Sequence, residues 1–245
     1  MKSIVAYHRP ARLDEAISLL ERPDVTTTVI AGGTAVTAAK LPEQTEVVDV
    51  QDVIPTGVES RDDRVVYGAM TRLTEVIADP LTPPLVAELA RREGPNTLRN
   101  ASTIGGTVAE GDGESELIAG LLVHDAQVTI TGLSDPVPLP ALLDDWSLLD
   151  RAIITSISID PSGLTASART GRTPADTSIV AVAGRVVTGG IRLALTGVGP
   201  TPILTTPEDL DSLEPPADFR GSSEYRRELA AVLTKRVVHQ LGGAS

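Results

Sequence analysis

The chain has 245 residues, a formal net charge of −12 and a hydrophobic content of 41%, which allows a sizeable core and two modest domains. An acidic surface repels phosphate backbones and anionic lipids, so we expect no nucleic-acid partner and no membrane partner. Aromatic residues make up only 2% of the chain, too few to build base-stacking platforms. The core must therefore be aliphatic.

Cysteine is absent, so the chain offers no disulfide, no cysteine nucleophile and no iron–sulfur ligand of its own. The three histidines lie far apart and lack zinc-ligand spacing. The acidic run between residues 110 and 116 does not follow the EF-hand pattern, and we expect no metal site there. The N-terminus does not resemble a signal peptide, and no run reaches the ~18 apolar residues of a membrane helix. These features predict a cytoplasmic protein.

The first half of the chain alternates predicted strands and helices, which favours an α/β arrangement. Apolar residues recur at i, i+3, i+4 and i+7 within residues 12–21, which predicts an amphipathic helix. Runs rich in β-branched residues predict strands at 25–30, 46–50 and 64–68. Helices are expected at 71–79 and 84–92, with a buried helix at 117–123.

In the second half, strands are expected at 126–132 and 152–159, separated by an irregular proline-rich segment at 134–146. The polar stretch 160–176 is the best candidate domain boundary. The sequence leaves residues 177–187 open between helix and strand, and predicts a turn and a strand within 189–203. An acidic, proline-containing surface loop is expected at 207–218.

A strong helix is predicted at 222–241, with Ser222 or Ser223 as its cap. Its apolar face is expected to consist of Tyr225, Leu229, Val232, Leu233 and Val237.

Two glycine pairs follow apolar β-branched residues. The first glycine loop (residues 29–36) reads "VIAGGTAV" and consists of Val29, Ile30, Ala31, Gly32, Gly33, Thr34, Ala35 and Val36. The second glycine loop (residues 103–107) reads "TIGGT" and consists of Thr103, Ile104, Gly105, Gly106 and Thr107.

Glycine allows close backbone approach and lets successive N–H groups converge on an anion, so both loops are candidate phosphate sites. Neither follows G-x-G-x-x-G or G-K-[ST]. Taken alone, each pattern belongs more often to a tight connection than to a binding site. Glu116 follows the second loop, and its carboxylate suits ribose or ribityl hydroxyls rather than a phosphate.

Six motifs, in order, resemble the flavin-binding medium subunit of molybdenum hydroxylases, the family of carbon monoxide dehydrogenase and xanthine dehydrogenase. They are "AYHRPARLDEA", "AGGTAVT", "RNASTIGGTVAEGDGESEL", "RTPAD", "TGVGPTP" and "EYRREL". The resemblance implies an α+β protein: a FAD-binding domain of the PCMH or vanillyl-alcohol-oxidase type over 1–164, with α/β subdomains at about 1–55 and 56–164, and a C-terminal domain over 165–245 with a small antiparallel sheet.

The resemblance also implies a cofactor and partners. FAD is held non-covalently, with both glycine loops around its diphosphate and Glu116 in contact with it. The chain is an oxidoreductase subunit that passes electrons from an iron–sulfur small subunit, supplied by a molybdopterin large subunit, to a terminal acceptor. The implied assembly is a dimer of heterotrimers. No catalytic acid or base and no metal ligand is assigned to this chain.

Four positions depart from the family pattern. Ala35 and Thr107 stand where the family has aspartate and asparagine, and Gly113 stands where it has proline. Arg169 is the only basic residue where relatives often carry an aromatic residue and a lysine. These departures motivate an alternative hypothesis, in which the chain is a degenerate, non-enzymatic scaffold subunit that no longer binds FAD. A stand-alone FAD oxidase is a third hypothesis, for which the sequence offers little sign of a substrate base.

Overall fold

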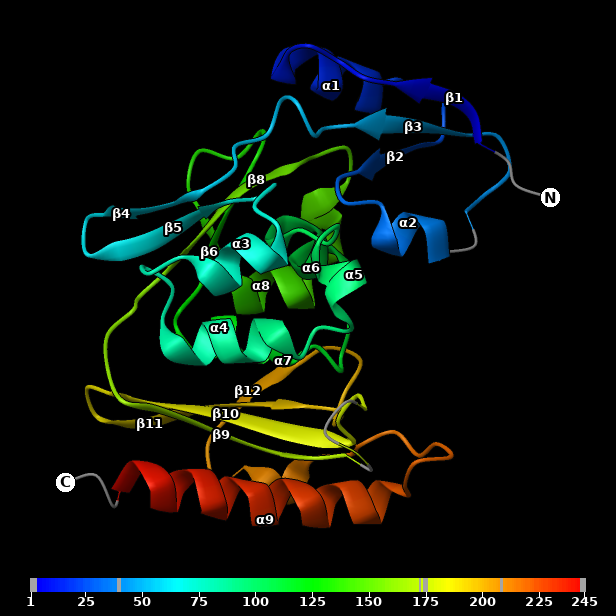
Figure 1. The fold of residues 1–245 in the computed structure, drawn as a ribbon. Helices are drawn as coiled ribbons and strands as arrows, with labels where there is room; N and C mark the ends of the chain where they lie inside the picture. Colours follow the sequence, from blue (N-terminus) through cyan, green and yellow to red (C-terminus); the bar gives the residue numbers. More distant parts are fainter. Residues whose placement is uncertain (1–3, 39–40, 172, 174–175, 208, 243–245) are drawn as a thin grey trace.

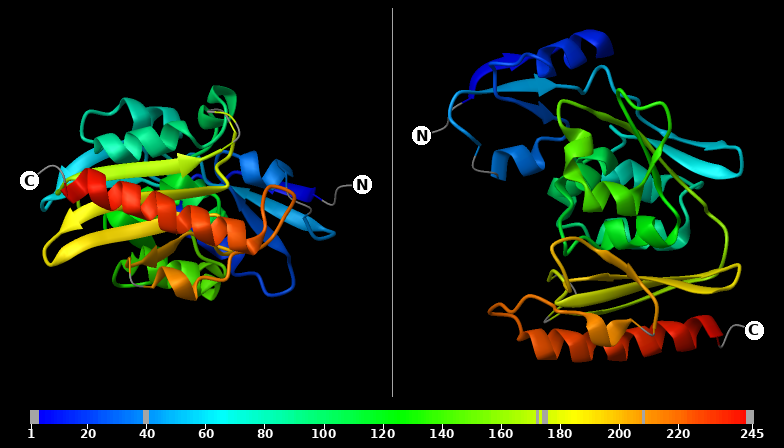
Figure 2. Two further views of the ribbon diagram at one scale, coloured as in Figure 1. Left: turned by 90° about the horizontal axis from the view of Figure 1, so that it is seen from below. Right: turned by 180° about the vertical axis from the view of Figure 1, so that it is seen from behind.

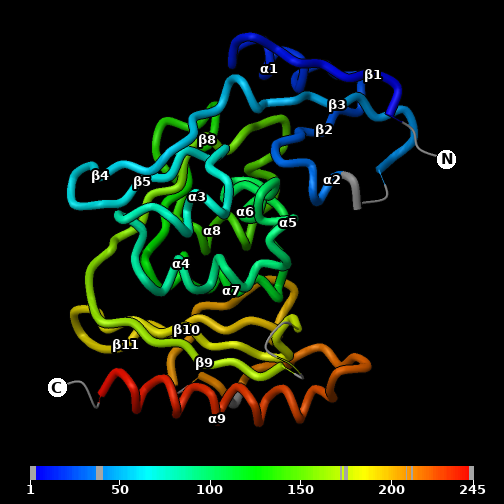
Figure 3. The backbone as a smooth tube through the Cα atoms, in the orientation of Figure 1, coloured from blue at the N-terminus to red at the C-terminus, as the bar shows by residue number. Residues whose placement is uncertain are grey.

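In the computed structural model, the described residues are 4–38, 41–171, 173, 176–207 and 209–242. Three sheets lie in successive layers, with helices between and outside them (Figure 1). The chain starts in the first layer and ends in the last, so β1 and α9 lie at opposite ends of the molecule (Figure 3). Within the described part, no helix is long and apolar enough to cross a membrane.

The first layer is a parallel three-stranded sheet in the order β1-β3-β2. Its strands are β1 (Ile4–His8), β3 (Thr45–Asp49) and β2 (Thr27–Ile30), and its helices are α1 (Leu13–Leu20) and α2 (Thr34–Ala38). The predicted helix at 12–21 and the strands at 25–30 and 46–50 are confirmed. The sequence did not reveal β1, because this edge strand is largely exposed and pairs only with β3, which lies far along the chain.

The middle layer is a five-stranded antiparallel sheet in the order β4-β5-β8-β6-β7. Its strands are β4 (Val58–Arg61), β5 (Arg64–Gly68), β8 (Ile154–Ile159), β6 (Gln127–Ile130) and β7 (Val137–Pro138). Its helices are α3 (Leu73–Ala78), α4 (Pro84–Arg91), α5 (Asn96–Arg99), α6 (Ile104–Glu110), α7 (Glu116–Val123), α8 (Leu139–Asp144) and the 3₁₀ turn η1 (Trp146–Leu149). The predicted strands at 64–68, 126–132 and 152–159 are confirmed, as are the helices at 71–79, 84–92 and 117–123.

The prediction of an irregular segment at 134–146 is wrong, because β7 and α8 together occupy residues 137–144. Pro138 is the N-cap of this helix and Pro140 lies in its first turn, where a missing N–H and a fixed φ cost nothing. The side chains of Leu139, Leu142 and Leu143 form the buried face of α8. These prolines therefore lie at the start of a helix, although the proline content of the segment predicted irregular structure.

The third layer is a four-stranded antiparallel sheet in the order β12-β11-β10-β9. Its elements are β9 (Thr165–Thr170), β10 (Val180–Val187), β11 (Gly190–Thr196), β12 (Ile203–Thr205), the 3₁₀ turn η2 (Leu210–Ser212) and α9 (Ser223–Gly242). The open choice at 177–187 is resolved as a strand. The polar stretch 160–176 contains β9, a half-buried edge strand that its polar composition concealed. Arg172, Pro174 and Ala175 of the "RTPAD" motif lie outside the described residues.

Helices cover both faces of the third sheet. Helix α9 packs against β9 and β10, while α7 packs against β10 and β11 from the other side (Figure 2). Every residue of α7 is buried, and α7 also contacts α4 in the middle layer. Helix α7 is therefore shared by the middle layer and the third sheet.

The predicted apolar face of α9 is partly wrong. Tyr225 and Val232 are 42% and 55% exposed. Arg226 is buried instead, and its Nη1 donates to the carbonyl oxygens of Ile179 and Gly197, both at 2.8 Å. A cation that satisfies two strand-end carbonyls thus takes a core position, which hydrophobic periodicity alone does not predict.

Candidate cofactor site

The first glycine loop connects the end of β2 to the start of α2. Gly33 has φ = +76°, a conformation that favours glycine. A Cβ atom on Gly32 would overlap the carbonyl oxygen of Ala101 and lie 2.7 Å from its carbonyl carbon. Among the residues that the structure describes, the amide N–H groups of Ala31 and Gly32 have no hydrogen-bond acceptor. The first loop therefore presents backbone donors that an anion can use.

The second glycine loop is the N-terminus of α6. Ile104 N–H donates to the Thr71 carbonyl oxygen and Gly105 N–H to that of Ala69, both at 2.9 Å. Thr103 is the N-cap residue: its Oγ1 accepts from Gly106 N–H at 3.1 Å, and its carbonyl oxygen accepts from Thr107 N–H at 2.9 Å. All four of these amides are therefore used within the protein. From Ile104 to Thr107 the loop therefore offers no free N–H group to an anion, whereas the Thr103 N–H has no acceptor among the described residues.

Close packing explains why the second loop contains glycine. A Cβ atom on Gly105 would lie 2.6 Å from Ala69 Cβ and 2.8 Å from Ala69 O. The loop therefore presents a smooth backbone surface, and it lies directly beside the first loop because Thr34 Oγ1 and Ser102 Oγ are hydrogen-bonded at 3.0 Å.

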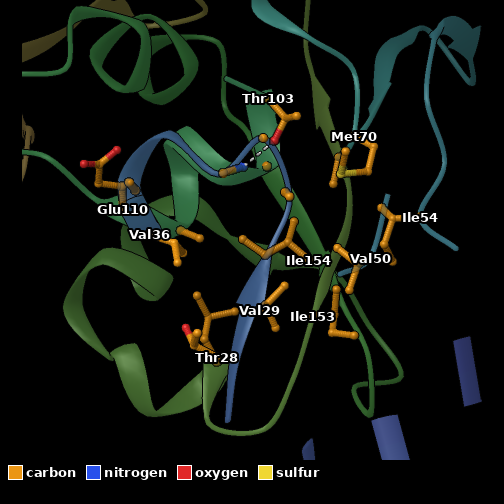
Figure 4. A pocket seen from close by; sticks show the side chains of 18 of the residues that line it. Thr28, Val29, Val36, Val50, Ile54, Met70, Thr103, Glu110, Ile153 and Ile154 are labelled. Atoms are coloured by element: carbon orange, nitrogen blue, oxygen red, sulfur yellow. Dashed lines mark hydrogen bonds between the residues drawn. The ribbon is translucent and has the colours of Figure 1, made fainter. Parts of the chain in front are cut away.

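Both loops face a cavity of about 400 Å³, here called the apolar cavity (Figure 4). The predicted site residues that line it are Val29, Ala31, Gly32, Gly33, Thr34, Ala35, Val36, Thr103, Gly105, Gly106 and Thr107. Two predicted residues of the loops do not line it: Ile104 is fully buried in the core, and Ile30 lies beneath Gly33. The structure thus brings most of the predicted residues of the two loops into one site.

The aliphatic wall of this cavity was not predicted from the sequence. It consists of Leu20, Val50, Ile54, Met70, Leu149, Ile153 and Ile154. Figure 4 shows Val50, Ile54 and Ile153 together on one side, with Glu110 at the opposite end. These side chains come from separate stretches of the chain, around Leu20, Val50, Met70 and Ile153, so no local motif marks them. The wall can cover an apolar group of a ligand.

A second cavity, of about 500 Å³ and here called the polar cavity, adjoins the first. Both cavities are lined by Thr34, Ala35, Ser102, Thr107 and Glu110, so they meet at the glycine loops. The rest of the polar cavity comes from the segment after α4, the segment that leads into α7 and the segment before β10, with Leu73 of α3 and Leu98 of α5. Its walls carry the carboxylates of Glu93, Asp112, Glu114 and Glu116 together with Arg92 and Ser178.

Glu116 lines the polar cavity but is committed to two arginines. Its Oε2 accepts from Arg92 Nη1 at 2.7 Å, and its Oε1 lies 3.0 Å from Arg169 Nε. The side chain is 5% exposed. The ion pairs join α7 to α4 and β9, so Glu116 connects the middle layer to the third sheet. Its contact with a cofactor stays a prediction.

Burial changes the protonation of the acidic groups in the polar cavity. Burial raises the pKa of Glu93 to about 7, although hydrogen bonds from Leu117 N–H at 2.8 Å and Ser115 Oγ at 3.0 Å act in the opposite direction. Burial also raises the pKa of Glu110 and of Asp112. Within the described residues, no group of three or more acidic, histidine or cysteine side chains is arranged to hold a metal ion.

A small parallel sheet and a larger antiparallel sheet, joined at paired glycine loops over a two-part cavity, define an α+β protein that binds an extended, two-part cofactor. The sequence matches the family described as "FAD binding domain in molybdopterin dehydrogenase" over residues 3–161. The chain belongs to this family, and FAD is its cofactor.

Relatives resemble the chain over nearly its full length. The carbon monoxide dehydrogenase medium chain of Hydrogenophaga pseudoflava is 24% identical over 273 residues, which cover 95% of each chain. A putative xanthine dehydrogenase FAD-binding subunit of Escherichia coli (strain K12) is 26% identical over 291 residues, covering 100% of this chain and 98% of the relative.

Solved structures confirm the predicted fold class. The carbon monoxide dehydrogenase from Hydrogenophaga pseudoflava that lacks the Mo-pyranopterin moiety superposes with a TM-score of 0.87 at 24% identity, covering 99% of both chains. A cyanide-inactivated Cu,Mo-CO dehydrogenase superposes with a TM-score of 0.85 at 25% identity, covering 100% of this chain and 99% of that one. The predicted family and the predicted class of oxidoreductase subunit are confirmed as well.

The residues present fit FAD. A side chain at Gly32 would overlap the Ala101 carbonyl and push the two loops apart, and the Ala31 and Gly32 amides have no acceptor among the described residues. The hydroxyl of Ser178 is 1% exposed and has no hydrogen-bond partner in the described part of the chain. A buried, unpaired hydroxyl in a cavity wall indicates a polar ligand. An apolar cavity and a polar cavity joined at backbone donors match the two ring systems and the diphosphate of a dinucleotide.

Proposed function

We propose that this chain is the flavoprotein subunit of a molybdenum hydroxylase that binds FAD non-covalently and passes electrons from an iron–sulfur partner to a terminal acceptor. The observation that carries the proposal is the meeting of the two cavities at the glycine loops. A mononucleotide would fill only one of them. We also propose the division into domains 1–164 and 165–245, with subdomains near 1–55 and 56–164.

The two loops have different roles in this proposal. The Ala31 and Gly32 amides and the Thr34 hydroxyl bind the diphosphate, while the second loop supplies a smooth surface on which the cofactor lies. The apolar cavity covers the adenine ring. The polar cavity suits the isoalloxazine ring, because that ring has alternating hydrogen-bond donors and acceptors along one edge. Bound FAD supplies reversible two-electron chemistry, and the protein supplies position and electrostatics.

The electron donor must be another subunit, because the chain has no cysteine and offers no cluster ligands of its own. Two of the relatives described above are named as a medium chain and as an FAD-binding subunit, names that fit a larger enzyme. We therefore propose an iron–sulfur small subunit and a molybdopterin large subunit as partners, in a cytoplasmic dimer of heterotrimers.

The visible absorption spectrum of the purified chain tests the proposal. We expect flavin bands and, after release, about one FAD per chain, as one continuous two-part site requires. A chain that is colourless and takes up no added FAD, even when co-expressed with its partners, would favour the scaffold alternative. Bleaching of the flavin by a small substrate in the isolated chain would favour a stand-alone oxidase.

A further inference from the structure

Glu93 lies at the inner wall of the polar cavity, just after α4. Only one of its carboxylate oxygens is used: Oε1 accepts from Ser115 Oγ at 3.0 Å and from Leu117 N–H at 2.8 Å. Oε2 has no partner among the residues that the structure describes. The first oxygen fixes the side chain against the start of α7, and the second remains available to the cavity.

The same cavity carries an independent sign of a ligand. The Ser178 hydroxyl enters from the segment before β10, is buried and lacks a partner within the described residues. Glu93 and Ser178 belong to different layers of the molecule. Both residues line the polar cavity, so a ring bound there would lie near each of them.

We propose that Glu93 takes up a proton when FAD bound in the polar cavity is reduced, so that the chain couples electron arrival to proton uptake. This inference rests on the proposed function. In this proposal Glu93 accepts a proton beside the cofactor. The charges around Glu93 set its affinity for that proton.

The charges that face Glu93 come from each neighbouring element. The segment after α4 carries Arg92, the segment before α7 carries Asp112 and Glu114, α7 begins with Glu116, and the end of α6 carries Glu110. Arg92 is paired with Glu88 and Glu116, Arg169 with Glu116, and Arg220 with Glu114. These ion pairs therefore neutralise carboxylates other than that of Glu93.

Burial and the remaining acids leave Glu93 with a pKa of about 7, so it is part protonated near neutral pH. Adding negative charge beside a carboxylate raises its affinity for a proton.

The electrons and protons of this step are all accounted for by the groups named in the proposal. Two electrons enter the flavin from the reduced iron–sulfur partner, or from dithionite in the laboratory, and the donor is oxidised. The flavin takes its own proton from solvent. The Glu93 carboxylate takes one further proton from solvent, forming an O–H bond, and no bond in the protein breaks.

The test compares the FAD-loaded wild-type chain with Glu93→Gln. The glutamine side chain of this variant keeps an amide oxygen for Ser115 and Leu117, and the substitution removes only the proton site. The matched control is Glu88→Gln, which removes the same charge from the same region but lies outside the polar cavity.

The readouts are proton uptake on reduction with dithionite in weak buffer and the flavin midpoint potential against pH. Each added proton per two electrons changes the potential by about 30 mV for a tenfold change in proton concentration.

We expect the wild type and Glu88→Gln to take up more protons than Glu93→Gln just above neutral pH, and to show the steeper potential slope there. Equal uptake and equal slopes in all three flavin-loaded proteins would overturn the inference and leave the proposed function intact. A chain that binds no FAD would overturn both.

An infrared difference spectrum of the wild type covers the case in which Glu93→Gln does not fold. Reduction should create a carboxylic-acid C=O band that shifts with ¹³C-labelled glutamate. The absence of such a band would contradict the inference.

Discussion

The two glycine loops have nearly the same sequence pattern and opposite physical uses. In the first loop, glycine brings backbone against backbone and leaves the amides of Ala31 and Gly32 without acceptors in the described part of the chain. In the second loop, the amides from Ile104 to Thr107 all have acceptors within the protein. The comparison shows that a glycine pair identifies close approach, but that only the fate of its N–H groups identifies an anion site.

The largest expected effect is that of Gly32→Ala. The added methyl would overlap the Ala101 carbonyl and displace the two unpaired amides. Loss of two charge-assisted hydrogen bonds should weaken FAD binding by at least about 100-fold. Fluorescence titration of the apoprotein with FAD measures this effect. The control is Gly242→Ala, whose methyl meets no atom within 4 Å, and equal affinity of the two variants would contradict the role of the first loop.

Gly105→Ala should affect folding more than binding. Its methyl would lie within 3 Å of Ala69 Cβ and O, in a region that cannot yield because the contact includes backbone. We expect a loss of about 3 kcal/mol in the free energy of unfolding, the upper end for overpacking. Urea unfolding measures it. Gly106→Ala meets only Thr103 Oγ1, at 3.0 Å, and should lose less; the reverse order would show that α6 is not fixed by this contact.

The variant Glu116→Gln distinguishes a structural role of Glu116, at the start of α7, from a contact with the cofactor. Removing the charge leaves Arg92 and Arg169 beside a neutral amide, which should lower the free energy of unfolding by about 2 kcal/mol. FAD affinity should change little. Paired urea unfolding and FAD titrations give both quantities. A large loss of affinity at unchanged stability would instead support the predicted contact with the cofactor.

The smallest effect is expected for Thr103→Ala, which removes the N-cap of α6. Loss of the bond to Gly106 N–H should lower the unfolding free energy by about 1 kcal/mol. Thr103→Ser keeps the hydroxyl and should restore most of it. If Thr103→Ala abolished FAD binding while leaving stability unchanged, the hydroxyl would be a ligand group and the contrast between the loops would fail.

Much of the fold could be predicted from local patterns. Helix α1, helix α7 and strand β3 each show their periodicity within a few residues. Strands β1 and β9 could not be predicted in this way, because both are edge strands whose half-exposed residues carry little apolar pattern. Helix α8 was missed because proline has different effects at the start of a helix and within it.

The glycine loops of the site could be predicted from the sequence, but the rest of the site could not. Motifs identified the two loops, because glycine at a close approach leaves a mark in the sequence. The aliphatic wall left none, since Val50, Met70 and Ile153 come from separate stretches of the chain and meet only after folding. The difference in amide use between the loops depends on acceptors at Ala69 and Thr71, so it also requires the tertiary structure.

Helix α7 has a consequence for the cooperativity of the molecule. All eight of its residues are buried, with the middle layer on one side and the third sheet on the other. The family match ends at residue 161, yet a fragment cut there would expose one side of its most apolar helix to water. The boundary of the recognisable domain is therefore not a boundary of independent folding. The full chain should melt in a single calorimetric transition, and the shorter fragment should aggregate.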